Sequence, residues 1–331
     1  MFLSGFKRFG QALLVLLSAY TAAFLLLAAL PSDGVLARYG NPELGLSLEQ
    51  LQEIRAVYGI DEQLSVRYLK SLGSFLQGDL GYSVQSGAKV ADLLAQALPA
   101  TLLLAGLGLL GALVLALIIA VAASYNRGGI VSSFFRNLPP LFVSLPVFWV
   151  GIVFIQIFSF KLGLVPTIGA TETQALVLPV LTLMIPIAAP LAQVFLRSID
   201  DVNRLPFVRV VETRGATQSW VLWRNVIPNA LLPVLTVAGV LFGELVGGAI
   251  VTETVFGRTG LGSLTAQAVA NRDTPVLLAV VVIVAAVYVV INFLVDLIYP
   301  ILDPRLRNSA ANSRDAVQKP MPIAVPGEEL A

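Results

Sequence analysis

Long segments without charged residues alternate with short polar ones along this chain, and their lengths predict most of the fold. A membrane-spanning helix needs about 20 mostly apolar residues to cross the hydrocarbon core of a bilayer. Six windows are that long, and the fifth of them contains one charge, Glu244. We therefore expect membrane-spanning helices at about residues 10–30, 99–124, 137–160, 174–196, 228–252 and 275–299.

The composition supports this fold class. The chain is 57% hydrophobic and 12% charged, whereas soluble domains are about half apolar and a quarter charged. A net charge of +1 argues against a nucleic-acid partner. We expect residues 1–302 to form an all-α, polytopic membrane domain. The first window could instead be a signal peptide after Lys7 and Arg8, but its length favours an uncleaved span.

Lysine and arginine predict the orientation of the spans, because short cytoplasmic loops carry an excess of both. If the N-terminus is cytoplasmic, the inner segments hold 13 of the 21 basic residues. The two short outer loops then hold only Lys161, Arg258 and Arg272. Both termini are therefore expected in the cytoplasm.

Residues 31–97 form the longest predicted segment outside the membrane, on the outer side. Ser47 is placed to cap a short amphipathic helix, and a second helix is expected from Val66 to Leu76, stopped by Gly78. The segment is too small for a core of its own, so we expect it to pack on the outer face of the spans. At the other end of the chain, residues 303–331 lack periodicity and are expected to be disordered.

Residues 197–227 form the largest predicted cytoplasmic loop. Asn203 could cap a helix that has Pro206 in its first turn and ends at Gly215. A second short helix is expected from Gln218 to Val226. One face of the first helix carries Phe207, Val210, Val211 and Arg214. Such a face outside the bilayer needs either a protein partner or lipid headgroups, and the residues alone leave both open.

Several kinds of chemistry are excluded. The chain has no cysteine and no histidine, so thiol chemistry and the usual zinc sites are absent. No P-loop motif occurs, so any ATP must be bound by another polypeptide. A G-x-G-x-x-G pattern at Gly106, Gly108 and Gly111 lies within a span, where it indicates helix packing. An intramembrane enzyme would need a cluster of catalytic groups, and Glu244 has no such companion within the spans.

The fifth span carries the candidate translocation path. Gly239, Gly243 and Gly247 repeat every four residues, which makes a smooth stripe that another helix can approach. Glu244 lies beside the stripe, and a carboxylate inside a membrane is expected to face a pore or a polar partner. In the fourth span, three prolines at 179, 186 and 190 predict kinks.

Taken together, these segments resemble the inner-membrane permease of a dipeptide/oligopeptide ABC importer, and the similarity runs from about residue 6 to residue 307. The order and spacing of several short motifs carry the resemblance. These motifs are Leu48 to Tyr68, Gly78 to Gly81, Leu98 to Leu102, Phe207 to Gly215, Pro228 to Pro233, Glu253 to Phe256, Gly260 to Gly262, Arg272-Asp273, Asn292 to Asp296, Tyr299 and Asp303 to Arg305.

In such permeases the large cytoplasmic loop carries a motif written E-A-A-x-x-x-G, which couples to the ATPase. Gly215 matches its glycine, Arg209 stands at the glutamate position, and valines replace the small residues. The resemblance implies that this helix docks in a groove on the nucleotide-binding subunit. The implied coupling residues are Phe207, Arg209, Val210, Val211, Glu212, Arg214, Gly215 and Ala216.

The resemblance also implies the partners and the location. A second homologous permease subunit, one or two P-loop ATPase subunits that hold ATP and Mg, and an extracytoplasmic substrate-binding protein would assemble in a bacterial or archaeal inner membrane, surrounded by lipid. The chain itself would need no cofactor or metal and would not be an enzyme. Di- or oligopeptides are the expected substrate, with nickel chelates, glutathione or another small solute as alternatives. A secondary transporter without ATPases is a further alternative.

Overall fold

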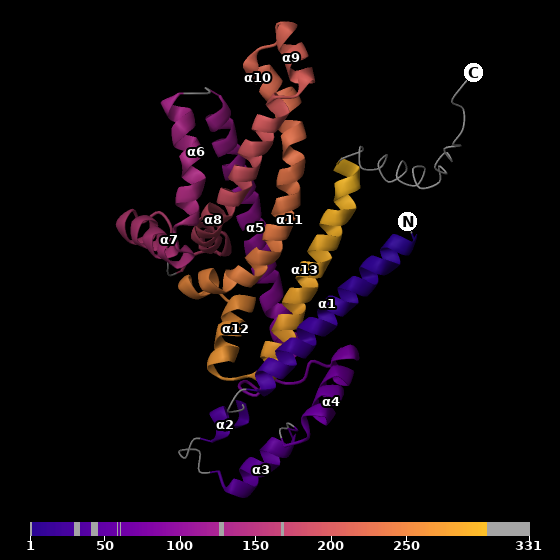
Figure 1. Ribbon diagram of the computed structural model, residues 1–331. Helices are drawn as coiled ribbons and strands as arrows, with labels where there is room; N and C mark the ends of the chain where they lie inside the picture. Colours follow the sequence, from indigo (N-terminus) through magenta and orange to yellow (C-terminus); the bar gives the residue numbers. More distant parts are fainter. Residues whose placement is uncertain are drawn as a thin grey trace, which may run out of the picture.

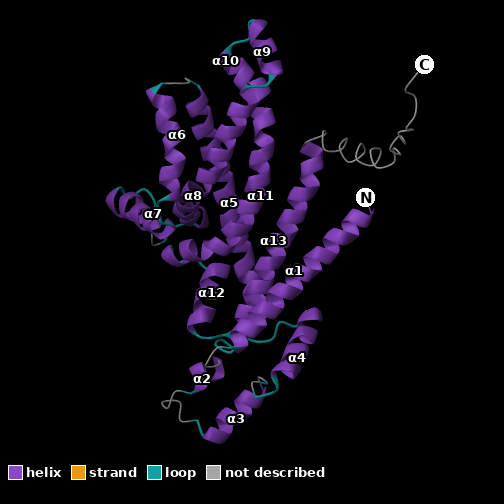
Figure 2. Ribbon diagram, viewed as in Figure 1, coloured by secondary structure: helices purple, strands orange, loops and turns teal. Residues whose placement is uncertain are grey.

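We analysed a computed structural model of the chain, which describes residues 2–29, 34–40, 46–57, 59, 61–125, 129–166 and 169–302. Every named element within these ranges is a helix (Figures 1 and 2). The predicted disordered tail, residues 303–331, lies outside them. Within the described ranges, five helices are long and apolar enough to cross a membrane, and a bent pair could provide a sixth crossing.

The helices form one bundle, in which α1 and α13 lie close together at the lower end of Figure 1 and diverge toward the upper end. Their bounds are α1 Phe2–Ala28, α2 Gly34–Tyr39, α3 Leu48–Val57, α4 Leu64–Leu76, α5 Val90–Ser124, α6 Ile130–Val143, α7 Val147–Phe154, η2 Ile155–Lys161, α8 Glu172–Asn203, α9 Pro206–Thr213, α10 Gln218–Val221, η3 Leu222–Val226, α11 Ile227–Val255, α12 Leu261–Ala270 and α13 Thr274–Leu302. We call the upper end of Figure 1 the α9 end and the lower end the α12 end.

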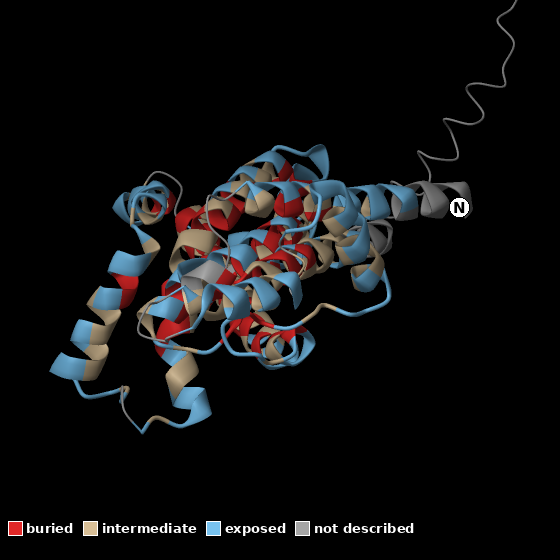
Figure 3. Ribbon diagram, turned by 90° about the horizontal axis from the view of Figure 1, so that it is seen from below, coloured by how far each residue is buried: buried red, intermediate tan, exposed pale blue. Residues whose placement is uncertain are grey.

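The close contact of α5 with α8 forms the centre of the bundle, where buried residues gather (Figure 3). Small side chains make it possible, because they let two helix backbones approach. Fully buried alanines of these two helices in the central cluster include Ala112, Ala116, Ala120, Ala188 and Ala192.

Two glycines of the predicted packing motif also lie in this contact. A methyl group on Gly108 would come 3.3 Å from Leu183, and one on Gly111 would come 3.1 Å from the Met184 sulfur. The helix-packing interpretation of this pattern is therefore confirmed at Gly108 and Gly111. Gly106 faces open space instead.

The third predicted span, residues 137–160, is not one straight helix. α6 and α7 meet at an angle of 106°, and α7 lies across the bundle in Figure 1. The bend falls at Pro146, which precedes α7 and cannot donate a backbone hydrogen bond. Hydropathy reports only how apolar a segment is, so it did not reveal this change of direction.

Two other predicted boundaries also differ. α5 begins at Val90 instead of 99, which shortens the expected 31–97 outer loop, and α8 continues past 196 to Asn203. Helices of 35 and 32 residues are longer than the hydrocarbon core of a bilayer is thick, whereas charge-free windows measure only the apolar part of each helix. α8 also runs as one helix through its three prolines, and the kinks predicted there stay a prediction.

The segment before α5 contains the two predicted short helices. Ser47 caps α3 in a reciprocal pair with Gln50, and α4 ends before Gly78, whose φ is +84°. Both expectations are confirmed. Between these helices Arg55 bonds Asp61 at 2.7 Å, and this hydrogen bond lowers the pKa of the exposed Asp61 carboxyl.

Two buried carboxylates fix the α12 end. Glu253, 1% exposed, accepts hydrogen bonds from Thr101 at 2.5 Å, from the Gly262 amide at 2.8 Å and from the Ser263 amide at 3.1 Å. It thereby joins α5 and α11 to the positive N-terminus of α12. The backbone of Ile250 lies so close to Gly262 that a Cβ there would overlap it.

Asp273 makes the second junction, just before α13. Its carboxylate accepts a hydrogen bond from the Ser83 hydroxyl at 2.5 Å and from the amides of Val84 and Gln85, both at 3.2 Å. The chain before α5 is therefore tied to the start of α13 by three hydrogen bonds to one buried charge.

Glu253→Ala tests the first junction. Each hydrogen bond to a buried charged group contributes about 1.5–3 kcal/mol, and the substitution leaves Thr101 and two amides without their partner. We expect the apparent Tm of the purified chain in detergent to fall by about 5 °C or more. Glu212→Ala, at an exposed position, is the control and should leave the Tm unchanged. An unchanged Tm for Glu253→Ala would show that this junction does not hold the α12 end.

Candidate functional site

The loop between α8 and α11 projects from the α9 end of the bundle (Figure 1). α9 begins at Pro206, where a missing amide proton costs nothing. The residue before it, Leu205, is the N-cap, so the expected cap at Asn203 is wrong. Asn203 is the last residue of α8, and its side chain donates to the Ile199 carbonyl at 2.7 Å.

Gly215 ends the turn after α9. Its φ is +88°, a left-handed conformation that residues with a side chain rarely adopt. Its surroundings are open, so the backbone angle and not a steric contact requires glycine there. The predicted stop at Gly215 is therefore found in the structure.

α9 has an inner and an outer face. Val208 is 1% exposed and packs in the buried cluster that also contains Ile199 of α8 and Val226 of η3. Val211 and Ala216 are partly buried against this cluster. Phe207 and Val210 are 37% and 50% exposed. Of the four residues predicted to share one face, Val211 thus packs toward the bundle, and the other three are exposed. The exposed charged residues of this segment are Arg209, Glu212 and Arg214.

The chain returns to the bundle through α10 and η3. The Thr217 hydroxyl accepts from the Trp220 amide at 3.4 Å and caps α10. The Ser219 hydroxyl and the Tyr125 hydroxyl are 2.8 Å apart, which links α10 to the end of α5. A polar cavity of about 390 Å³ lies beside this link, between α5, α8 and α10.

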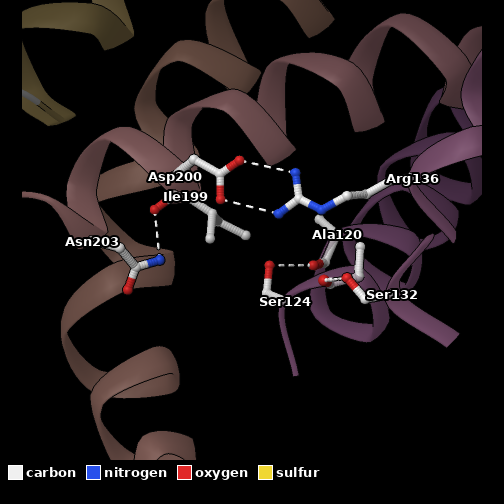
Figure 4. A network of polar contacts seen from close by, with 8 residues as sticks. Ala120, Ser124, Ser132, Arg136, Ile199, Asp200 and Asn203 are labelled. Atoms are coloured by element: carbon white, nitrogen blue, oxygen red, sulfur yellow. Dashed lines mark hydrogen bonds and ion pairs between the residues drawn. The ribbon is translucent and has the colours of Figure 1, made fainter. Parts of the chain in front are cut away.

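A bidentate ion pair braces the base of this loop (Figure 4). The Arg136 guanidinium on α6 donates to both carboxylate oxygens of Asp200 on α8, at 2.9 and 3.1 Å. Close by, the Ser132 hydroxyl donates to the Ala123 carbonyl at 2.5 Å and joins α6 to α5. α6 is therefore attached to α8 in the last turn before α9.

The four residues proposed for a translocation path do not share one environment. Gly239 and Gly243 are buried, and a Cβ on Gly243 would overlap the ring of Tyr288 on α13. Gly247 is exposed with open space around it, and Glu244 is exposed as well. The glycine stripe therefore serves helix packing in its first half and faces outward in its second half.

Glu244 lies on an exposed face of α11 that includes Val240 and Val251, which are 41% and 43% exposed. This face is far along α11 from the α9 loop, so the two predicted sites are separate. Among the described residues, no group of three or more acidic side chains could hold a metal ion.

Glu253, Gly262 and Asp273 belong to the motifs that carry the family resemblance, but the sequence alone predicted no role for them. Two local signals were available. Glu253 precedes Gly262, in the first turn of α12, by nine residues, and Asp273 lies directly before the start of α13. The partners Thr101 and Ser83 are 152 and 190 residues away from their acids, so no local pattern predicts the pairing.

Comparison with known proteins places the chain in a family. The sequence profile described as "Binding-protein-dependent transport system inner membrane component" matches residues 112–308. A probable peptide ABC transporter permease of Sinorhizobium fredii is 32% identical over 86% of this chain and 92% of its own length. A glutathione transport system permease of Escherichia coli is 34% identical over 86% of this chain and 92% of its own length.

A solved structure shares the fold. The inward-facing MetNI methionine ABC transporter contains a chain that aligns with a TM-score of 0.53 and 20% identity, over 64% of this chain and 96% of its own length. The family profile begins within α5, so α1 to α4 precede the part that it describes. The chain belongs to the family of binding-protein-dependent transport system inner membrane components, as a membrane-spanning permease subunit of an ABC importer.

Proposed function

We propose that this subunit forms half of a translocation path for di- or oligopeptides and is driven through α9 by a separate ATPase subunit. The observation that carries the proposal is the outer face of α9. Phe207 and Val210 are exposed on a helix that projects beyond the bundle. A groove on a partner would remove this apolar surface from water, which stabilises a complex by about 25 cal/mol per Å².

The inner face of α9 supports a mechanical role. Val208 packs in the same buried cluster as Ile199 of α8 and Val226 of η3. A displacement of α9 is therefore passed to both helices that flank the loop. The Arg136–Asp200 pair extends this connection to α6. Closure of ATP-loaded partner subunits would then move these helices together as a rigid body, which alternates access to the path.

The partners follow from what the chain lacks. It has no P-loop, so one or two ATPase subunits would hold ATP and Mg. An extracytoplasmic binding protein would deliver the substrate at the α12 end. The excess of basic residues in the segments at the α9 end supports a cytoplasmic position for that end and for both termini, in a bacterial inner membrane.

The exposed face of α11 supports contact with a second permease subunit. A charged side chain at the centre of a membrane-spanning helix costs about 2.5–3.5 kcal/mol on insertion scales. Glu244 is exposed on this face between Val240 and Val251. A water-filled path between two subunits would hydrate its carboxylate, whereas lipid would not.

The substrate class rests on the relatives. Two kinds of similar permease are named for peptides and for glutathione, which is itself a small peptide. We therefore propose a short peptide as the substrate of this subunit. Glutathione is the first alternative to test.

Gly215→Val tests the coupling. Valine at a φ of +88° is strained by about 1–2 kcal/mol or more, so the turn after α9 would rearrange. We expect about tenfold less ATPase subunit to co-purify, with normal membrane insertion, because 1.4 kcal/mol corresponds to tenfold in affinity. Gly163→Val introduces the same kind of strain at φ +62° in another exposed turn and is the matched control. Wild-type uptake by Gly215→Val would contradict the docking role.

Glu244→Leu tests the path. The substitution removes the charge and keeps a bulky side chain, so we expect uptake to fall by about tenfold while the ATPase subunits still bind. Val240→Leu on the same face should transport normally. Reconstituted vesicles loaded with ATP and given labelled dipeptide provide the assay. Normal uptake by Glu244→Leu would indicate that this face lies against lipid.

Reversing the charges of the Arg136–Asp200 pair tests whether movement of α8 is passed to α6. Asp200→Arg places two cations together, and we expect the amount of peptide transported per ATP hydrolysed to fall. Arg136→Asp combined with Asp200→Arg restores opposite charges and should recover part of this ratio. Both side chains are about one third exposed, at 36% and 32%, so the effect on stability alone should be small. An unchanged transport ratio in the single variant would show that the pair does not transmit movement.

A further inference from the structure

α4 has three faces, and each meets a different environment. Tyr68, Leu72 and Phe75 pack against α1 in a cluster with Tyr20 and Phe24. The polar side of the helix carries Arg67, Lys70 and Ser74. The remaining side carries apolar residues with exposures of 40% for Val66, 67% for Leu69 and 77% for Leu76.

The packed face attaches α4 to the apolar span of α1. The Tyr20 hydroxyl donates to the Ser71 hydroxyl at 2.7 Å, and the hydroxyls of Thr21 and Tyr68 are 2.8 Å apart. Tyr20 and Thr21 lie within the apolar span Gly10–Ala28. At 1.5 Å per residue they stand roughly 10–12 Å before its last residue. The middle of α4 is therefore attached to a part of α1 that is inside the membrane.

The polar face of α4 lines a cavity. This cavity has a volume of about 720 Å³ and lies between α4, the loop that precedes α5 and the start of α13. Its lining includes Glu62, Arg67, Lys70 and Ser74. The Lys70 ammonium bonds the Glu62 carboxylate at 2.5 Å, and the Arg67 guanidinium stacks 5.6 Å from the centre of the Phe24 ring. Arg67 and Lys70 thus line the cavity, on a different side of α4 from Leu69 and Leu76.

The exposed apolar face continues the surface of α1. A shallow groove along α1 is lined by Leu17, Thr21 and Leu25, and Thr21 is the residue that bonds Tyr68 of α4. Leu17 and Leu25 are 45% and 50% exposed on a membrane-spanning helix. Exposed residues of α1 and α4 therefore adjoin where the two helices touch.

From this arrangement we propose that α4 is an interfacial helix, half immersed in the leaflet at the α12 end, with lipid acyl chains on Val66, Leu69 and Leu76. A helix with one apolar and one charged side lies in the plane of the membrane interface in this way. Tyr68 and Arg67 belong to the residue types that anchor such interfaces. The helix holds α2 and α3 at the membrane surface without crossing it.

The absence of cysteine from the chain makes a direct test possible. Leu69→Cys and Leu76→Cys would each be labelled with a nitroxide in the full-length chain, reconstituted in phosphatidylethanolamine and phosphatidylglycerol vesicles. Oxygen concentrates in the hydrocarbon, whereas a nickel chelate stays in water, so the ratio of their collision rates reports the environment. We expect both labels to favour oxygen. A label at Leu26, which is 72% exposed on the apolar span of α1, should do the same and serves as the reference.

Two matched controls lie on the water side. Labels at Val57, 84% exposed on α3, and at Lys70, on the polar face of α4, should favour the nickel chelate. Nickel-favoured collisions at Leu69 and Leu76 would overturn the proposal.

A protein partner would give a different result from lipid. If a binding protein covered the apolar face, the labels at Leu69 and Leu76 would favour the nickel chelate in the absence of that protein. They would become immobile only when the protein is added. This result would also overturn the proposal. Leu69→Trp provides an independent reading, in a chain whose tryptophans at 149, 220 and 223 are changed to phenylalanine. Its fluorescence should be quenched by lipids brominated on their acyl chains, and unquenched fluorescence would contradict the immersion of α4.

Discussion

The close contact between α5 and α8 is the interaction on which the rest of the structure depends. In a bilayer, helices gain little from hydrophobic burial against one another, so close packing of small side chains has to hold them together. Ala112, Ala116 and Ala120 provide this packing on α5, opposite Ala188 and Ala192. Because α8 is fixed along much of its length, the loop that follows it projects as a firm extension of the bundle.

Polar contacts are arranged around this apolar centre at both ends. Arg136 and Asp200 form an ion pair that stays about one third exposed, which allows it to rearrange at modest cost. At the opposite end, Glu253 and Asp273 are 1% and 2% exposed and are held by several hydrogen bonds each. Removal of any one partner there leaves a buried charge with fewer hydrogen bonds, which is costly. The α12 end is therefore built as a fixed base, and the α9 end is the side on which movement is less costly.

The sequence predicted the parts of this molecule that depend on local physics. Charge-free windows coincide with helices long and apolar enough to cross a membrane, because burying a charge in lipid is costly. Ser47 marked a helix start by its side-chain hydroxyl, and Pro206 and Gly215 marked helix ends by their backbone preferences. The bend before Pro146 and the extension of α5 to Val90 depend on packing with residues outside each charge-free segment. Gly243 faces Tyr288 and Glu253 meets Thr101 only after distant segments come together, so their roles required the structure.

The attachment of α4 to α1 has a consequence for biosynthesis. α1 is made first, but its large neighbour in the bundle, α13, is made last. The hydroxyl groups of Tyr20 and Thr21 find partners only 51 and 47 residues along the chain. Contacts that close short loops form early because they lose less chain entropy. The α1–α4 unit can therefore complete its own polar contacts while the ribosome is still making the central helices, and α13 needs only to add apolar surface at the end.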